Sequence, residues 1–168
     1  RGFSAPVHLH YPYSDAELAL LLAHDSDAFA RWEAGQTLYR RAMQQNVQAL
    51  LAGQPLPEHP VLIHSLNTLL AQSMDADFKA LLLHVPTETE LWEVLGPTDP
   101  IVLWSAREAL LDRMASACLN ALDAAEQWAQ QQEAHSDVAQ PYEYHPQLAG
   151  VRRLRNACRL LLLRAQPQ

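Results

Sequence analysis

Histidine is the residue type that first suggests chemistry in this sequence, because the chain contains eight of them. A helical His-Glu-x-x-His pattern would hold a zinc ion, but no histidine here is followed by glutamate. His8 and His10 share one face of an expected strand, yet no carboxylate or third histidine follows nearby. The pattern favours a solvated strand face, and the sequence predicts no metal site. The other histidines fall at expected helix ends and loops: His24, His59, His64, His84, His135 and His145.

Nucleophiles and paired carboxylates are the next candidates for catalysis. Cys118 and Cys158 lie in apolar helical patterns, away from the helix N-termini that lower a thiol pKa. No Gly-x-Ser-x-Gly elbow occurs. Glu88, Glu90 and Glu93 crowd one helix start, where negative charge is favourable for structural reasons. We therefore expect no catalytic residues, and two reduced core cysteines that fit a cytoplasmic location.

Arginines form the sharpest electrostatic feature of the chain. Residues 1–149 carry 7 Lys/Arg against 19 Asp/Glu, whereas residues 150–168 carry 5 arginines and no acidic residue. Arg152, Arg155 and Arg159 follow i, i+3, i+7 spacing and share one helix face. This face could bind an anion or nucleic acid, or could form ion pairs with the acidic remainder or a neighbouring domain. The acidic balance favours ion pairing and argues against a nucleic-acid partner.

Leucine, alanine and the start and stop signals predict helices through most of the chain. Capping boxes begin at Ser14 and Thr87, and an aspartate precedes proline at Asp99. We expect about seven helices, which begin after Ser14, after Asp25 or Ser26, at Pro60, after Asp75, after Thr87, at Pro100 and at Pro146. The helix that begins at Pro100 is expected to be the longest and to end near Gln131.

The fold class that follows is all-α, an irregular antiparallel helix array. Short connections place sequential helices side by side, either as a compact bundle or as an α-solenoid of the armadillo or HEAT kind. Residues 3–13 alternate in polarity and predict an extended or β segment. We therefore divide the chain into residues 1–13, a linker or strand from a preceding domain, and residues 14–168, a helical array truncated at its C-terminal end. No apolar run approaches the roughly 20 residues of a membrane span, so we expect no membrane partner.

Tryptophans mark where this array could meet another domain. Trp32 and Trp104 stand at helical spacing and are typical of a core or of inter-domain packing. Trp92 and Trp128 are expected to be half-exposed, which would mark a surface that another domain covers.

Several stretches, taken in order, resemble bacterial aminopeptidase N, a zinc metallopeptidase family of the gluzincin type. The similarity extends over nearly the whole chain and is carried by Phe3–Val7, Ser14–Asp15, Phe29–Gln36, Gly53–Leu56, Asp99–Ile101, Ala106–Leu110 and Leu154–Cys158. Phe3–Val7 resembles the exit from that family's β-sandwich domain, and Ser14–Asp15 resembles the start of its helical domain.

The resemblance implies a parent enzyme that removes N-terminal amino acids from peptides with one zinc ion. The family's zinc ligands, its Gly-Ala-Met-Glu-Asn loop and its catalytic tyrosine match no position here, so no catalytic or metal residue is carried over. The implied role is a non-catalytic helical segment that supports the catalytic domain and shapes substrate access. Its partners would be the catalytic and β-sandwich domains of the same chain. The alternative is a free-standing helical-repeat scaffold that binds another protein.

Overall fold

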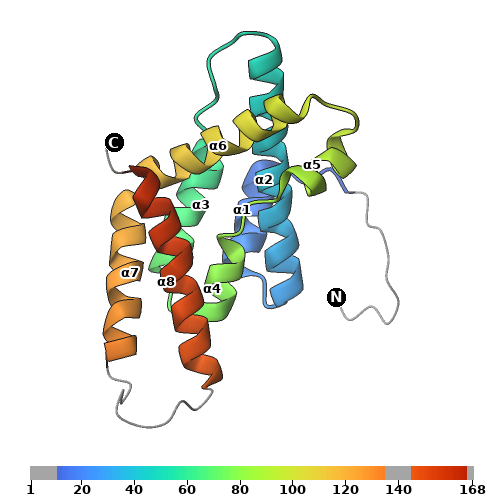
Figure 1. Ribbon diagram of the computed structural model, residues 1–168. Coiled ribbons are helices and arrows are strands. Elements are labelled where there is room, and N and C mark those ends of the chain that lie inside the picture. Colours follow the sequence, from blue (N-terminus) through green and yellow to red (C-terminus); the bar gives the residue numbers. More distant parts are fainter. Residues whose placement is uncertain (1–10, 135–144, 166–168) are drawn as a thin grey trace.

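Helices account for all the regular secondary structure in residues 11–134 and 145–165, which are the residues that this computed structural model describes (Figure 1). The helices are α1 (Asp15–His24), α2 (Ala28–Leu51), α3 (Pro60–Ala71), α4 (Ala76–Leu82), α5 (Glu88–Leu95), α6 (Pro100–Ala117), α7 (Leu119–Ala134) and α8 (Pro146–Ala165). The predicted all-α array of antiparallel helices is confirmed. Within the described ranges, no helix combines the length and apolarity needed to cross a bilayer.

Side-chain caps start most of the helices where the sequence predicts. The Ser14 and Thr87 hydroxyls each accept from the backbone N–H three residues on, and the glutamates at those positions bond back to the cap. Asp75 and Asp99 cap α4 and α6 as expected. These caps satisfy N–H groups that have no partner inside the helix.

The start of α2 differs from the prediction. Asp27, rather than Asp25 or Ser26, caps the helix, and its carboxylate accepts from the N–H groups of Phe29 and Ala30. The Asp25 carboxylate instead accepts from the Asp27 N–H at 2.9 Å, which closes the turn between α1 and α2. Asp25 and Asp27 can both cap a helix, and the geometry of the turn places Asp27 at the N-cap position.

The helix expected from Pro100 to about Gln131 is broken at Cys118, so the described chain has eight helices rather than about seven. The Ser116 hydroxyl donates to the carbonyls of Asp112 and Arg113, and the Asn67 amide donates to the Ala117 carbonyl. Side chains that compete for helix carbonyls in this way bend a helix. In Figure 1, α6 therefore crosses above α3 and α8, while α7 descends from its end.

α8 is the element on which three others converge. It lies antiparallel beside α7 and also packs against α4 and α6, while α2 packs against α1 and α6 (Figure 1). One continuous hydrophobic core results, and its least exposed large side chains are Tyr39, Met43, Leu66, Leu69, Leu91, Leu103, Leu110, Met114, Leu122 and Leu154. α5 contributes only Leu91 to the fully buried residues, so it is the most peripheral helix of the described chain.

Three apolar residues that helical spacing places on the apolar faces of their helices are exposed. Phe29, Leu81 and Val94 are 69%, 43% and 59% exposed. Phe29 lies in the first turn of α2, where its ring packs on Trp32 at a centroid distance of 5.8 Å rather than in the core. Helical spacing identifies an apolar face, but it does not reveal where that face extends beyond its neighbours.

The extended segment predicted for residues 3–13 falls largely outside the described residues, and so do His8 and His10. Its described part, residues 11–13, is not a strand. The Tyr13 N–H donates to the Tyr11 carbonyl at 2.9 Å, which forms a tight turn around Pro12. Proline fixes its own φ angle and donates no hydrogen bond, which favours a turn over a paired strand.

Candidate functional site

The arginine face of α8 is occupied by glutamates of α7. The Arg155 guanidinium contacts the carboxylates of Glu126, at 3.0 Å, and Glu133. Arg159 contacts Glu126 at 2.9 Å, and Arg152 lies 3.8 Å from Glu133. The hydrogen bond from Arg155 is the main reason that the pKa of Glu126 is lowered.

These contacts confirm the ion-pairing interpretation of Arg152, Arg155 and Arg159. Glu126 is 12% exposed and Arg155 18% exposed, so their pairing is partly shielded from solvent. The network joins α7 and α8 along their lengths. The arginines therefore do not form a free basic surface. The other α8 arginines are paired as well, Arg153 with Asp77 of α4 and Arg164 with Glu108 and Asp112 of α6.

Buried polar side chains on α2 hold the end of α4 and the segment that follows it. The Tyr39 hydroxyl donates to the Leu82 carbonyl at 2.9 Å, and the Gln36 amide donates to the His84 carbonyl at 3.1 Å. Arg107 of α6 donates to the Pro86 carbonyl at 3.0 Å. These bonds satisfy backbone groups that a connecting segment would otherwise bury without partners. They fix the start of α5 against α2 and α6.

Cationic side chains cap two helix C-termini that converge in the interior. The Lys79 ammonium donates to the carbonyls of Leu70 and Gln72 at 2.9 and 2.7 Å, and burial lowers its pKa. The Arg31 guanidinium donates to the Leu22 carbonyl at 2.8 Å and lies over the Phe78 ring. Positive charge at a helix C-terminus complements the helix dipole, so both residues have a structural role.

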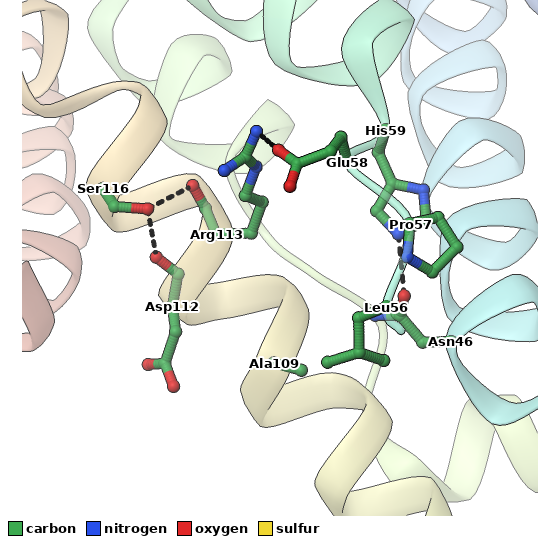
Figure 2. Close-up of a pocket in the computed structure, with 9 residues that line it drawn as sticks. All are labelled: Asn46, Leu56, Pro57, Glu58, His59, Ala109, Asp112, Arg113 and Ser116. Carbon is green, nitrogen blue, oxygen red and sulfur yellow. Dashed lines mark hydrogen bonds and ion pairs between the residues drawn. The ribbon is translucent and has the colours of Figure 1, made fainter. Parts of the chain in front are cut away.

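A pocket of about 350 Å³ lies between the α2–α3 connection and α6 (Figure 2). Asn46 and His59 lie at its inner side, where the His59 Nε2 atom is 2.8 Å from the Asn46 Oδ1 atom. The Asn46 amide also donates to the Ala106 carbonyl of α6 at 3.0 Å. Glu58 of the α2–α3 connection pairs with Arg113 of α6, and both residues line the pocket.

His59 has an unusual backbone conformation for its residue type. Its φ and ψ angles are 49° and 50°, in the left-handed region, and it forms the N-cap of α3 directly before Pro60. Its side chain is 8% exposed, and this burial lowers its pKa. The hydrogen bond to Asn46, together with burial, holds the strained residue in place.

The chemistry available in the pocket is limited by how its groups are paired. The Ser116 hydroxyl donates to backbone carbonyls of its own helix, not to a base. The Asn46 carbonyl oxygen accepts from His59, and the Arg113 guanidinium is paired with Glu58. Among the residues that line the pocket, no nucleophile contacts a base. Their hydrogen bonds and ion pair instead connect α2, the α2–α3 connection and α6.

The remaining candidates from the sequence are dispersed. Within the described residues, no three His, Cys, Asp or Glu side chains gather closely enough to hold a metal ion. Cys118 and Cys158 are buried and free, as predicted, and burial raises their pKa values to about 11 and about 12. Glu90 belongs to the capping box of α5, and Glu88 lies 3.8 Å from Arg107.

Exposed apolar side chains gather on α5 and the first turns of α6. Trp92 and Val94 on α5 are 43% and 59% exposed, and Ile101 and Trp104 on α6 are 71% and 56% exposed. Trp128 on α7 is 43% exposed, so the prediction that Trp92 and Trp128 are half-exposed is confirmed. Large exposed apolar side chains are typical of surfaces that contact another protein or domain.

A protein-family model described as "Domain of unknown function (DUF3458_C) ARM repeats" matches residues 15–168. The chain therefore belongs to this family of ARM-repeat domains, and of the two arrangements that the sequence left open, the α-solenoid of the armadillo or HEAT kind agrees with this match. Aminopeptidase N of Escherichia coli (strain K12) is 34% identical over 161 residues, which cover 93% of this chain. Aminopeptidase N of Caulobacter vibrioides is 35% identical over 160 residues, which cover 94%.

A solved structure shows the same relationship. It is a crystal structure of Legionella pneumophila aminopeptidase A in complex with aspartic acid, with a TM-score of 0.77 and 25% sequence identity. The match covers 98% of this chain and 19% of that one. The chain spans 17% of the length of the two relatives named above. These matches confirm the expected resemblance to the helical C-terminal region of aminopeptidase N, and they imply further domains in the same polypeptide.

The buried polar residues were not identified from the sequence. Asn46 stands between Met43 and Val47 on the apolar stripe of α2, and a polar residue in such a stripe is the signal that could have revealed it. Lys79 follows Phe78 inside a short apolar helix and gives a similar signal. Asn46 bonds to the Ala106 carbonyl, 60 residues further along the chain, and Lys79 bonds to the carbonyls of Leu70 and Gln72 at the end of the preceding helix. The sequence alone does not locate these partners.

Proposed function

We propose that this chain is the helical, non-catalytic segment of a zinc-dependent bacterial aminopeptidase that removes N-terminal amino acids from peptides. The observation that carries the proposal is the match to two aminopeptidase N sequences over more than nine-tenths of this chain. The zinc ion and its ligands would belong to polypeptide outside the described residues, which offer no cluster of three ligands. Two unpaired cysteines are compatible with the cytoplasmic location that we include in the proposal.

The segment would act as a rigid wall that supports the catalytic domain and narrows the path of the peptide. A continuous core and cross-links between helices give the stiffness that such a wall needs. The exposed residues Trp92, Ile101 and Trp104 supply an apolar surface for contact with another domain. The peptide substrate itself would be bound mainly by the catalytic domain.

The proposal is tested with the chain alone and with the full polypeptide that contains it. We expect the chain alone, incubated with zinc, to hydrolyse an alanyl chromogenic amide no faster than buffer. The full polypeptide should hydrolyse it and should contain a His-Glu-x-x-His signature on the N-terminal side of Arg1. A start codon near Arg1, with no such signature, would favour the free-standing scaffold instead. Turnover by the chain alone would contradict both functions.

A further inference from the structure

The junction between residues 11–14 and the helical array has more fixed contacts than a flexible linker needs. The Tyr13 N–H donates to the Tyr11 carbonyl across Pro12, and the two tyrosine rings contact each other in a tilted arrangement with centroids 4.5 Å apart. Ser14 then caps α1 through a reciprocal pair of bonds with Glu17. Each of these contacts is local, so together they shape the segment without attaching it to the rest of the array.

Arg41 attaches this shaped segment to α2. Its guanidinium contacts the Asp15 carboxylate at 2.5 Å and donates to the Tyr13 carbonyl at 2.7 Å. It therefore holds the chain on both sides of the Ser14 cap. The planar guanidinium presents its donors in a fixed fork, so holding two acceptors at once restrains direction as well as distance.

The core explains only part of this arrangement. Tyr13 packs partly against the core, but Tyr11 is 54% exposed. Arg41 and Asp15 are themselves 35% and 43% exposed, so their contact contributes little to global stability. Because these contacts add little to global stability, we expect that they serve to orient residues 11–14 relative to α2.

We propose that Arg41, Tyr13 and Asp15 form a strap that fixes the direction in which the chain leaves the N-terminal end of the helical array. The strap would set the orientation of whatever domain is joined there, and that consequence rests on the proposed function. The strap itself involves residues of this chain alone. Neighbouring Arg40 provides a matched control, because it pairs with Glu33 and Thr37 on its own helix.

The direction of the chain is measured by the distance between two spin labels, on Tyr11→Cys and Gln48→Cys, because Tyr11 is the first residue that the structure describes and is 54% exposed. Gln48 is exposed on α2, and the buried thiols of Cys118 and Cys158, whose pKa values are about 11 and about 12, should stay unlabelled. We expect Arg41→Met to broaden the distance distribution, whereas Arg40→Met leaves it unchanged. An unchanged distribution in Arg41→Met overturns the proposal.

Hydrogen exchange supplies an independent measurement on the unlabelled full chain. The amides of Glu17 and Leu18, which bond to Ser14, should exchange about tenfold faster in Arg41→Met, equivalent to losing one charge-assisted hydrogen bond. Amides in the centre of α2 should be unaffected. If Arg41→Met fails to fold, Arg41→Lys and Asp15→Asn give the same test with smaller changes. Equal exchange in all the variants overturns the strap, and this result does not depend on any peptidase assay.

Discussion

Individual buried polar residues connect separate helices. Tyr39, Asn46 and Lys79 each donate to a backbone carbonyl on another segment, and each is at most 8% exposed. A hydrogen bond of this kind contributes modestly when made, but a buried carbonyl left without a donor costs about 1–3 kcal/mol. These residues therefore specify how the helices are arranged more than how strongly they pack.

His59 makes the stability of the array depend on pH. Burial lowers its pKa in the folded chain below the ordinary value of 6.5, and the charge of Asp15 offsets only part of this effect. Between the two pKa values the unfolded chain binds more protons, so the free energy of unfolding rises with pH. We expect stability to fall as the pH drops below about 6.5 and to level off below the folded pKa.

This dependence is measured by urea unfolding of the chain between pH 5 and pH 8. His59→Asn is the control, because asparagine tolerates the left-handed conformation and does not titrate. The variant should lose the part of the slope that His59 causes. Identical slopes in the two proteins would show that His59 titrates in the folded chain as it does in the unfolded one.

α4 and α8 approach each other closely at Gly150, which has no side chain. A Cβ atom built on Gly150 of α8 would lie 2.9 Å from the Asp77 Cβ atom and 3.0 Å from its backbone nitrogen. α4 and α8 therefore pack against each other at a distance that only glycine permits. Gly35 of α2 differs, because its added Cβ atom would meet a Leu22 methyl group at 3.4 Å.

The two glycines predict opposite results for the same substitution. Alanine is more favourable than glycine inside a helix by about 1 kcal/mol. We expect Gly35→Ala to leave stability unchanged or raise it by up to about 1 kcal/mol. Gly150→Ala should lower stability by roughly 1–3 kcal/mol, since backbone must move to relieve the overlap. Thermal and urea unfolding measure both, and a stabilised Gly150→Ala would show that α8 shifts freely against α4.

At the scale of the molecule, several described helices carry exposed apolar side chains, and α5 and the neighbouring turns of α6 carry four of them: Trp92, Val94, Ile101 and Trp104. Ile101 and Trp104 are more than half exposed, whereas Leu103 between them is 1% exposed. One short stretch of helix thus serves both the core of the array and a surface available for a second domain. Surface of this kind is expected in a segment that spans 17% of its relatives' length.

Substitutions in this stretch separate the two surfaces. Ile101→Asp and Trp104→Ser should leave the melting temperature of the chain alone nearly unchanged, because they remove no buried contact. In the full polypeptide they should lower the melting temperature and, on the proposed function, the kcat/KM for peptides. Leu103→Ala is the comparison and should destabilise both forms by about 2–5 kcal/mol. Equal behaviour of Ile101→Asp in the two forms would place the domain contact elsewhere.

Much of this molecule follows from the sequence by itself. Capping boxes at Ser14 and Thr87, proline at Pro100 and Pro146, and the apolar stripes predict the helices, because these signals act within one or two turns. The partners of the arginine face could also be anticipated in kind, since an acidic chain with a basic end favours internal ion pairs. The resemblance to aminopeptidase N depends on the order of several short stretches of sequence. Helix propensity, charge and spacing alone do not identify that family.

Only the tertiary structure decided which residues meet. The predicted long helix ends at Cys118, and residues 11–13 form a turn rather than a strand. Phe29 and Val94 are exposed. Asn46 contacts His59, and Arg41 contacts Tyr13 and Asp15 at the start of α1. The physical reason is range: caps and stripes depend on neighbours within a few residues, whereas bends, buried polar pairs and exposed faces depend on which distant helix comes to lie alongside.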